Sequence, residues 1–211
     1  TFGIDGALSY ASVLDLGRLW ERLLRRAGLP LAYTQGFSPH PRLQFASALP
    51  VGYTSEAELL EVWLAIAVPP AAFREAVCRQ APRGLAIRQV EEVPLDAPVP
   101  QARMRAATYR VRLYSERSRA DVEAAVQGLL ARDEVPRVRQ RKGRAVAYDL
   151  RPLIHTITCV DQPGEWHELA MELRCSSGGS GRPEEVADAL DLDIRACIVR
   201  RTGLIWENKQ E

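Results

Sequence analysis

Metal-binding cysteine motifs are missing from this chain. Its four cysteines, at positions 78, 159, 175 and 197, lie 81, 16 and 22 residues apart, and no Cys-x-x-Cys spacing occurs. The ligand patterns of zinc ribbons and iron–sulfur clusters are therefore excluded. The last three cysteines lie in apolar or alternating segments, where a thiol behaves as a small hydrophobic group. Unpaired cysteines of this kind suit a reducing cytoplasm, and we expect that location.

Histidine and long apolar runs are also scarce. Three histidines in 211 residues leave few ligands for a His/Asp/Glu metal site, so we predict neither a metal nor another cofactor. No apolar run approaches the ~20 residues that a membrane-spanning helix needs. The longest candidate, residues 62–72, is interrupted by Pro69-Pro70, so no membrane association is predicted. Walker and dinucleotide-binding glycine patterns do not occur either.

The net charge of +1 conceals an uneven distribution. Residues 103–144 hold 12 Lys and Arg against 5 Asp and Glu, which gives a local net charge of +7. Residues 145–211 carry a net charge of −5 and residues 1–102 a net charge of −1. A basic middle segment permits a polyanionic partner.

The order of apolar and turn segments predicts an α+β protein of two tandem ferredoxin-like (βαββαβ) units with antiparallel sheets. The first unit is expected over residues 1–95. Ser12 is placed to cap a helix whose apolar positions recur at helical spacing as far as Ala27. We expect strands at residues 43–46, 58–67 and 85–93, and a second helix over 70–80.

A proline-containing linker at residues 94–102 separates this unit from a second unit, expected over residues 103–211. Residues 109–114 alternate as a strand does, and Ser118 is placed to cap a helix over residues 119–132. Residues 135–140 and 144–150 predict a hairpin around Lys142-Gly143. A strand over 166–173 and a helix over 183–190 follow.

One loop in the first unit stands out. Gly36-Phe37-Ser38-Pro39-His40-Pro41-Arg42 places a histidine between two prolines. Each proline fixes its own φ and disfavours the helical region for the residue before it, so Ser38 and His40 are held extended. Gly36 permits a turn that residues with a Cβ resist. We predict that His40 and Arg42 contact an anionic partner, although such a loop can also serve as a connection.

Basic residues of the first helix form the second candidate region. Arg22, Arg25 and Arg26 lie on or beside its polar stripe, and guanidinium groups suit phosphate oxygens. Pairing with Glu56, Glu58 or Glu61 is the alternative, and both stay open. The predicted ligand-binding residues are Arg22, Arg25, Arg26, Gly36, Phe37, Ser38, His40, Arg42 and Glu58.

The densest basic run is residues 137–144. On a regular hairpin strand, Arg137, Arg139 and Arg141 would share one face, a ribbon that suits a nucleic-acid backbone. The aromatic residues typical of base stacking are absent from this run, and a basic hairpin tip can also serve solubility. The predicted nucleic-acid-binding residues are Arg137, Arg139, Arg141, Lys142 and Arg144.

Several segments resemble a family of uncharacterised bacterial proteins that is linked to radical-SAM proteins. The similar segments are Arg25-Arg26-Ala27-Gly28-Leu29-Pro30, Gly36-Phe37-Ser38-Pro39-His40-Pro41, Ala48-Leu49-Pro50-Val51-Gly52, Asp149-Leu150-Arg151-Pro152-Leu153 and Arg200-Arg201-Thr202-Gly203-Leu204. The resemblance implies a domain of unknown function, found beside or fused to a radical-SAM protein. The family usually has Ser-His-Leu-Asp where this chain has Ser12-Val13-Leu14-Asp15, so a two-histidine catalytic or metal site shared by the family cannot be assumed here.

The function expected from these observations is that of a non-catalytic accessory protein. It would bind substrate for a radical-SAM enzyme, the partner that the resemblance implies, and the expected substrate is RNA or a ribosomal component. Two alternatives stay open. One is a metal-independent endoribonuclease-like enzyme with His40 as the base. The other is a small-ligand binder at the interface of the two units.

Overall fold

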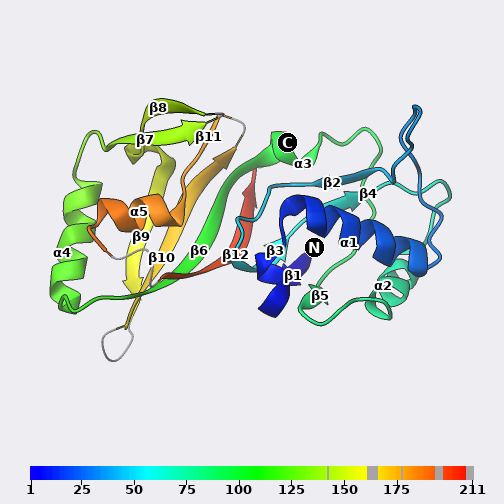
Figure 1. Cartoon of the computed structure of the whole chain (residues 1–211), viewed down its shortest axis with the longest axis horizontal. Helices are drawn as coiled ribbons and strands as arrows, with labels where there is room; N and C mark the ends of the chain where they lie inside the picture. Colours follow the sequence, from blue (N-terminus) through cyan, green and yellow to red (C-terminus); the bar gives the residue numbers. More distant parts are fainter. Residues whose placement is uncertain (142, 161–165, 177, 193–196, 208–211) are drawn as a thin grey trace. The chain divides into compact units, whose positions relative to one another are not determined.

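The computed structural model describes residues 1–141, 143–160, 166–176, 178–192 and 197–207. These residues form two compact units, Thr1–Met104 and Arg105–Glu211 (Figure 1). The linker predicted at residues 94–102 ends in a short helix, α3 (Pro100–Arg103), immediately before this boundary. No helix in the described part of the chain is both long and apolar enough to cross a membrane.

Unit 1 is built from two small antiparallel ladders and two main helices. Strand β1 lies between β3 and β5, and β2 pairs with β4 in a separate two-stranded ladder. Its elements are β1 (Phe2–Ile4), the 3-10 helix η1 (Gly6–Tyr10), α1 (Val13–Arg26), β2 (Leu43–Phe45), β3 (Thr54–Glu58), β4 (Leu60–Val62), α2 (Pro70–Cys78), β5 (Leu85–Ile87) and α3.

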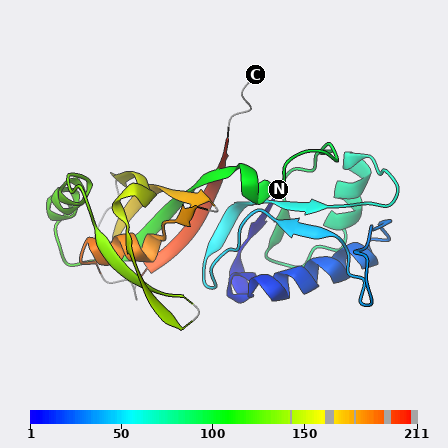
Figure 2. The ribbon, with the colours of Figure 1, turned by 90° about the horizontal axis from the view of Figure 1, so that it is seen from above.

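Helix α1 forms where the sequence predicts it. The Ser12 hydroxyl accepts a hydrogen bond from the Asp15 amide (3.2 Å) and so satisfies one of the free donors of the first turn. Leu16, Trp20, Leu23 and Leu24 are buried on one side, and α1 lies along the strands of unit 1 (Figure 2). The Trp20 ring meets the Phe2 ring of β1 edge to face at 5.0 Å, a favoured aromatic geometry. This packing places the polar stripe of α1 on the outside.

Unit 2 consists of a sheet, helices and an added hairpin. Strand β10 pairs antiparallel with β6 on one side and with β9 and β11 on the other, and β12 follows β6. Its elements are β6 (Met104–Tyr114), α4 (Arg119–Leu130), β7 (Pro136–Arg141), β8 (Arg144–Asp149), the 3-10 helix η2 (Arg151–Leu153), β9 (Ile154–Val160), β10 (Trp166–Ser176), β11 (Gly179–Ser180), α5 (Pro183–Ala189) and β12 (Cys197–Trp206).

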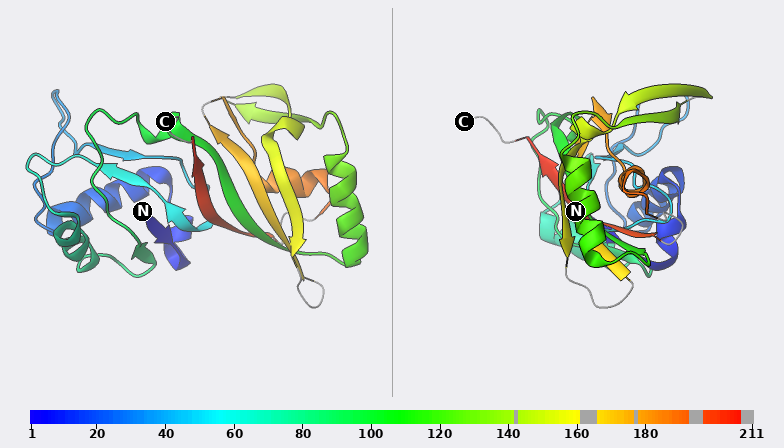
Figure 3. Two further views of the ribbon diagram at one scale, coloured as in Figure 1. Left: turned by 180° about the vertical axis from the view of Figure 1, so that it is seen from behind. Right: turned by 90° about the vertical axis from the view of Figure 1, so that its left-hand side faces the viewer.

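Alternating burial in this sheet follows from the pleat of its strands. Along β10 every second residue from Leu169 to Cys175 is buried, because successive side chains point to opposite faces. Helix α5 lies on one face of the sheet (Figure 3). Strands β7 and β8 pair only with each other among the described residues and form a separate hairpin.

The predicted α+β class is confirmed, but the tandem ferredoxin-like arrangement is not. In unit 1, β2 pairs with β4 instead of joining the sheet of β1, β3 and β5. The single strand predicted over residues 58–67 is wrong, because pairing breaks at Leu59 and separates β3 from β4. Apolar residues on both faces suggested one buried strand, whereas β3 and β4 belong to different ladders.

Candidate functional site

The Gly-Pro-His loop is the turn of a short antiparallel pair. Tyr33 lies opposite Pro41, and the Arg42 amide donates to the Ala32 carbonyl at 2.9 Å. The Thr34 amide donates to the His40 carbonyl (2.8 Å), and the His40 amide donates to Oγ1 of Thr34 (3.0 Å). These bonds close the turn, so its backbone is held by its own hydrogen bonds as well as by its prolines.

The tip of the turn is open to solvent. Gly36 has φ +132°, a conformation that side chains disfavour, and no atom lies within 4 Å of the place a Cβ would take. Glycine is therefore needed here for its backbone freedom and not for lack of space. Phe37 follows it with 110% relative exposure, and Ser38 is also exposed. In Figure 1 the segment between α1 and β2 projects from the body of unit 1 as a narrow hairpin.

The two faces of the pair carry different side chains. Because alternate residues of an extended chain point to opposite sides, Tyr33 and Pro41 share one face, and His40 and Arg42 share the other. The Arg42 guanidinium lies over the Trp63 ring, 4.9 Å from its centroid, in a cation–π contact. The Trp63 amide donates to the Arg42 carbonyl at 3.1 Å, so the backbone holds this contact in register.

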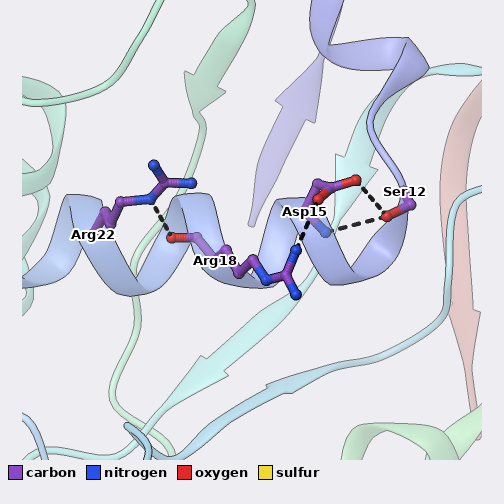
Figure 4. Close-up of polar contacts among 4 residues, drawn as sticks. All are labelled: Ser12, Asp15, Arg18 and Arg22. Atoms are coloured by element: carbon purple, nitrogen blue, oxygen red, sulfur yellow. Dashed lines mark hydrogen bonds and ion pairs between the residues drawn. The ribbon is translucent and has the colours of Figure 1, made fainter.

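On α1, one predicted arginine reaches the loop. The Arg25 guanidinium lies 6.0 Å from the centroid of the Tyr33 ring and 4.0 Å from the Glu21 carboxylate. Arg26 instead binds the side-chain and backbone oxygens of Gln80 at 3.3–3.4 Å. Figure 4 shows that Arg22 folds back along α1, where its Nε donates to the Arg18 carbonyl at 3.3 Å.

The neighbouring Arg18 reaches Asp15 within α1 at 3.4 Å (Figure 4). The predicted basic stripe is therefore divided among local partners, and Arg25 is the member that lies beside the loop. We use the term loop surface for the exposed or half-exposed side chains of Arg25, Tyr33, Phe37, His40, Arg42 and Trp63.

Glu58 does not belong to the loop surface. It is 3% exposed and accepts a hydrogen bond from the Ser55 hydroxyl at 2.6 Å. Glu61 binds Arg103 at 3.0 Å, and its burial raises the pKa of its carboxyl while Arg103 opposes that shift. Neither carboxylate is exposed beside the loop, whereas Glu21 lies 4.0 Å from Arg25 and offsets part of the charge at that end of the loop surface.

No catalytic constellation surrounds His40 among the described residues. Its imidazole makes no hydrogen bond or ion pair within that part of the chain, and no group of three metal-ligating side chains is found there. The other two histidines are engaged elsewhere. His155 lies 3.0 Å from the Glu172 carboxylate, and His167 lies 3.0 Å from the Arg117 carbonyl. The geometry at His40 suits contact with a ligand that comes from outside.

Two arginines of the basic hairpin in unit 2 are paired with acidic residues of α5. Arg139 binds Glu185 through two hydrogen bonds of 2.8 and 2.5 Å and donates a third, of 3.0 Å, to the Ser180 carbonyl. Its guanidinium also lies 4.7 Å from the Tyr148 ring centroid. Arg137 lies 3.6 Å from Asp188. The two arginines do share a face, as predicted, but that face meets acidic side chains.

The pKa directions at this cluster agree with its geometry. The hydrogen bonds that Arg139 donates to Glu185 raise the pKa of Arg139, and burial, with the nearby Glu185 carboxylate, raises the pKa of Tyr148. Both side chains therefore keep their protons at neutral pH. Of the remaining predicted residues, Arg144 is exposed on β8, the backbone of Arg141 pairs with Arg144, and Lys142 lies outside the described residues.

Tyr33 and Trp63 were not predicted as site residues. The sequence offers a weak signal for Tyr33, which lies three residues before Gly36. It offers none for Trp63, because 20 residues separate it from the turn and only the pairing of β2 with β4 brings it to Arg42. Arginines of both basic regions therefore have aromatic partners in the structure, Tyr148 in unit 2 and Tyr33 and Trp63 in unit 1.

Three comparisons place the chain among known proteins. A model of a protein family described as "uncharacterized protein conserved in bacteria (DUF2344)" matches residues 1–183. No curated protein matches the chain. A chain in the crystal structure of a Cbf5-Nop10-Gar1 complex is similar in structure, with a TM-score of 0.50 and 9% sequence identity. The alignment covers 91% of this chain and 45% of that chain. At this identity the likeness concerns the fold alone.

Proposed function

The chain belongs to the DUF2344 family of uncharacterised bacterial proteins, and we propose that it is a non-catalytic binding module for RNA. The loop surface is the binding site in this proposal. The module presents its RNA, or a ribosomal component that contains RNA, to a radical-SAM enzyme in the cytoplasm. The link to a radical-SAM enzyme rests on the sequence resemblance alone.

The observation that carries the proposal is the charge around the loop. Residues 22–55 contain four arginines and no Asp or Glu. Arg25 and Arg42 are exposed, and each is held against an aromatic ring. Guanidinium groups held in this way lose little side-chain entropy when they meet phosphate oxygens. Glu21 lies beside Arg25, but no carboxylate of the described residues pairs with Arg42, and a surface with this excess of exposed cations attracts a polyanion.

The pairing of arginines in unit 2 supports the choice of the loop surface as the binding site. Its densest basic run places Arg137 and Arg139 against Asp188 and Glu185. A phosphate would have to displace these carboxylates, whereas at Arg42 it would meet a guanidinium that faces solvent. We therefore assign the main contact to the loop surface and only a secondary one to the exposed Arg144.

Replacement of Arg42 tests the proposal. The logarithm of the binding constant for a fluorescein-labelled RNA should fall linearly with the logarithm of salt concentration. Arg42→Ala should reduce the slope of that line by about 0.7 to 1, because one phosphate contact is lost. Fluorescence anisotropy between 50 and 200 mM KCl measures both quantities.

Arg79→Ala is the matched control. Arg79 is also an exposed arginine of unit 1, but it pairs with Glu75 on α2. Its loss should leave the slope unchanged. Absence of RNA binding by the unaltered protein at 50 mM salt would refute the proposed function, and equal slopes for the two variants would refute the assigned site.

The competing proposal is a metal-independent ribonuclease. The observation that favours it is the shared face of His40 and Arg42, which would bring a base and a phosphate-stabilising cation to one RNA strand. RNA cleavage that survives EDTA and disappears in His40→Ala would establish this activity. Intact RNA after prolonged incubation with the protein would favour the non-catalytic module.

The partner enzyme can be tested separately. A pull-down of the protein with the radical-SAM protein encoded beside it should recover both chains, and sequencing should identify the RNA that they retain. Recovery of RNA without the enzyme would leave the binding function in place and remove the proposed partner.

We also propose that unit 2 alone is a ferredoxin-like unit with the β7–β8 hairpin inserted. Its strands β6, β9, β10 and β12 alternate with α4 and α5 in the order βαββαβ. The first of these strands, β6, lies between the third and the fourth, as in a split βαβ arrangement.

A further inference from the structure

Phe37 has no structural role in the described part of unit 1. Its ring is fully exposed at the tip of the turn, where it buries no apolar surface. A phenylalanine in water forgoes the stabilisation of about 1.5–3 kcal/mol that its burial provides. The turn that carries it is nevertheless closed by the hydrogen bonds between Thr34 and His40. An ordered loop that displays an uncovered ring is pre-organised for a flat partner.

The surroundings of Phe37 indicate which partner that is. Tyr33 and Trp63 lie on opposite faces of the hairpin, since the residues that alternate along it point to opposite sides. Each ring has an arginine guanidinium against it, Arg25 at 6.0 Å and Arg42 at 4.9 Å. Aromatic rings and guanidinium planes stack on unpaired bases, and the same cations bind the phosphates between them.

We infer that the loop surface binds single-stranded RNA in preference to duplex RNA, with one unpaired base stacked on the ring of Phe37. This inference rests on the proposed function and specifies its substrate class. In a duplex, each base is already covered by its neighbours, and the deep, narrow major groove is closed to side chains. A duplex therefore offers phosphates to Arg25 and Arg42 but no base to Phe37.

Charge favours RNA over a protein partner at this tip. A protein that buried Phe37 in an apolar pocket would also have to cover the neighbouring cations, Arg42 among them. Fully desolvated cations without partners are costly in such an interface. Single-stranded RNA supplies the flat apolar surface and the anionic groups in one molecule.

The test compares one RNA sequence in two forms. A 12-nucleotide single strand and the same strand annealed to its complement are titrated with the unaltered protein at 50 mM KCl. The single strand should bind more tightly. Phe37→Ala should weaken its binding roughly 5- to 150-fold, the range found when one stacking partner is removed, and should leave duplex binding unchanged. Phe37→Trp should retain the preference for the single strand.

A direct readout of stacking accompanies the affinities. With 2-aminopurine in the strand, the unaltered protein should quench its fluorescence and Phe37→Ala should not. Leu95→Ala is the control, since Leu95 is a 91% exposed apolar residue outside the loop surface. All variants should have the thermal midpoint of the unaltered protein, because Phe37 and Leu95 are exposed.

The outcomes separate this inference from the proposed function. Equal binding of both RNA forms, or an unchanged affinity in Phe37→Ala, would overturn the stacking role, while a reduced salt slope in Arg42→Ala would still support RNA binding. No binding of either form would overturn both proposals. If Phe37→Ala abolished capture of the radical-SAM protein but not of the single strand, the ring would be a protein contact and the inference would be wrong.

Discussion

Replacement of Glu185 by glutamine should loosen the β7–β8 hairpin of unit 2 without unfolding the sheet. The carboxylate of Glu185 accepts two hydrogen bonds from Arg139, at 2.8 and 2.5 Å. At the base of the hairpin, the Asp149 carboxylate accepts bonds from the amides of Val135 (2.7 Å) and Arg151 (2.9 Å). The base is therefore anchored independently, and the outer part depends on contacts with α5.

The size of the effect follows from the exposure of the pair. Two unit charges 4 Å apart attract by about 4 kcal/mol at an effective dielectric constant of 20. Desolvation offsets part of this gain. Exposed pairs contribute about 0–1 kcal/mol, and breaking a buried pair costs about 3–5 kcal/mol. The side chains of Arg139 and Glu185 are 24% and 17% exposed, so we expect an intermediate loss of about 1–3 kcal/mol.

Hydrogen exchange measures this loss where it occurs. A two-stranded hairpin is only marginally stable in water by itself, so its amides should exchange through undocking from α5. A loss of about 1–3 kcal/mol corresponds to exchange that is roughly 5- to 150-fold faster in β7 and β8. The amides of β10, which lie inside the sheet, should be unaffected. Mass spectrometry of peptic fragments resolves the two regions.

Glu123→Gln provides the matched control. Glu123 binds Arg119 at 2.7 Å on the surface of α4, where both side chains are more than 40% exposed. Its loss should change exchange little, in accord with the small contribution of exposed pairs. Unchanged exchange of the hairpin in Glu185→Gln, or equal acceleration throughout unit 2, would refute the reasoning. The same Glu185→Gln substitution also bears on RNA binding. An Arg139 that is released from Glu185 can contact a phosphate, so the slope of log K against log salt for single-stranded RNA should become steeper by about 0.7.

Two further predictions concern the helix cap and the thiols. Ser12→Ala should destabilise unit 1 by about 0.5–2 kcal/mol in urea unfolding at pH 7, and Ser118→Ala should do the same in unit 2, because both hydroxyls cap a helix in the same way. The Ser12 hydroxyl lowers the pKa of Asp15 below its ordinary 3.8. The associated stability is present above that pH and lost as pH falls through the lower native value, so the defect of Ser12→Ala should shrink at pH 2–3; a defect equal at both pH values would contradict this coupling. Burial raises the pKa of Cys197 to about 11, so at pH 8 roughly one molecule in a thousand carries the reactive thiolate. Iodoacetamide should therefore modify exposed Cys78 long before Cys197, as followed by mass spectrometry, and equal rates would show that Cys197 is not shielded.

Local patterns predicted helices better than strand partners. The cap at Ser12 and the repeating leucines located α1, and the cap at Ser118 with Pro183 located α4 and α5 to within a few residues. Capping and helical periodicity depend on residues within one or two turns of each other. The division of residues 54–62 into two strands could not be predicted in this way, because it depends on which distant segment each strand pairs with.

The candidate site, too, could be predicted from the sequence only where it depends on residues close together in the chain. The sequence placed His40 and Arg42 in a constrained turn, and the prolines and Gly36 that constrain it are adjacent in the chain. It also grouped Arg22, Arg25 and Arg26 as one basic stripe. The structure separates them, since Arg26 binds Gln80, 54 residues away in the chain. Helical periodicity in a sequence predicts which side chains share a face of the helix. It does not predict which other segments that face contacts.

By itself, then, the sequence determined the rigid turn, the capped helices, the acid-free segment around the loop and the uneven distribution of charge. Each of these follows from nearest-neighbour geometry or from composition. Only the tertiary structure decided that Trp63 lies under Arg42, that Glu58 is buried, and that α5 neutralises Arg137 and Arg139. These outcomes depend on strand register and on packing between segments far apart in the chain. For this reason we propose the loop surface, and not the most basic run, as the site of the main RNA contact.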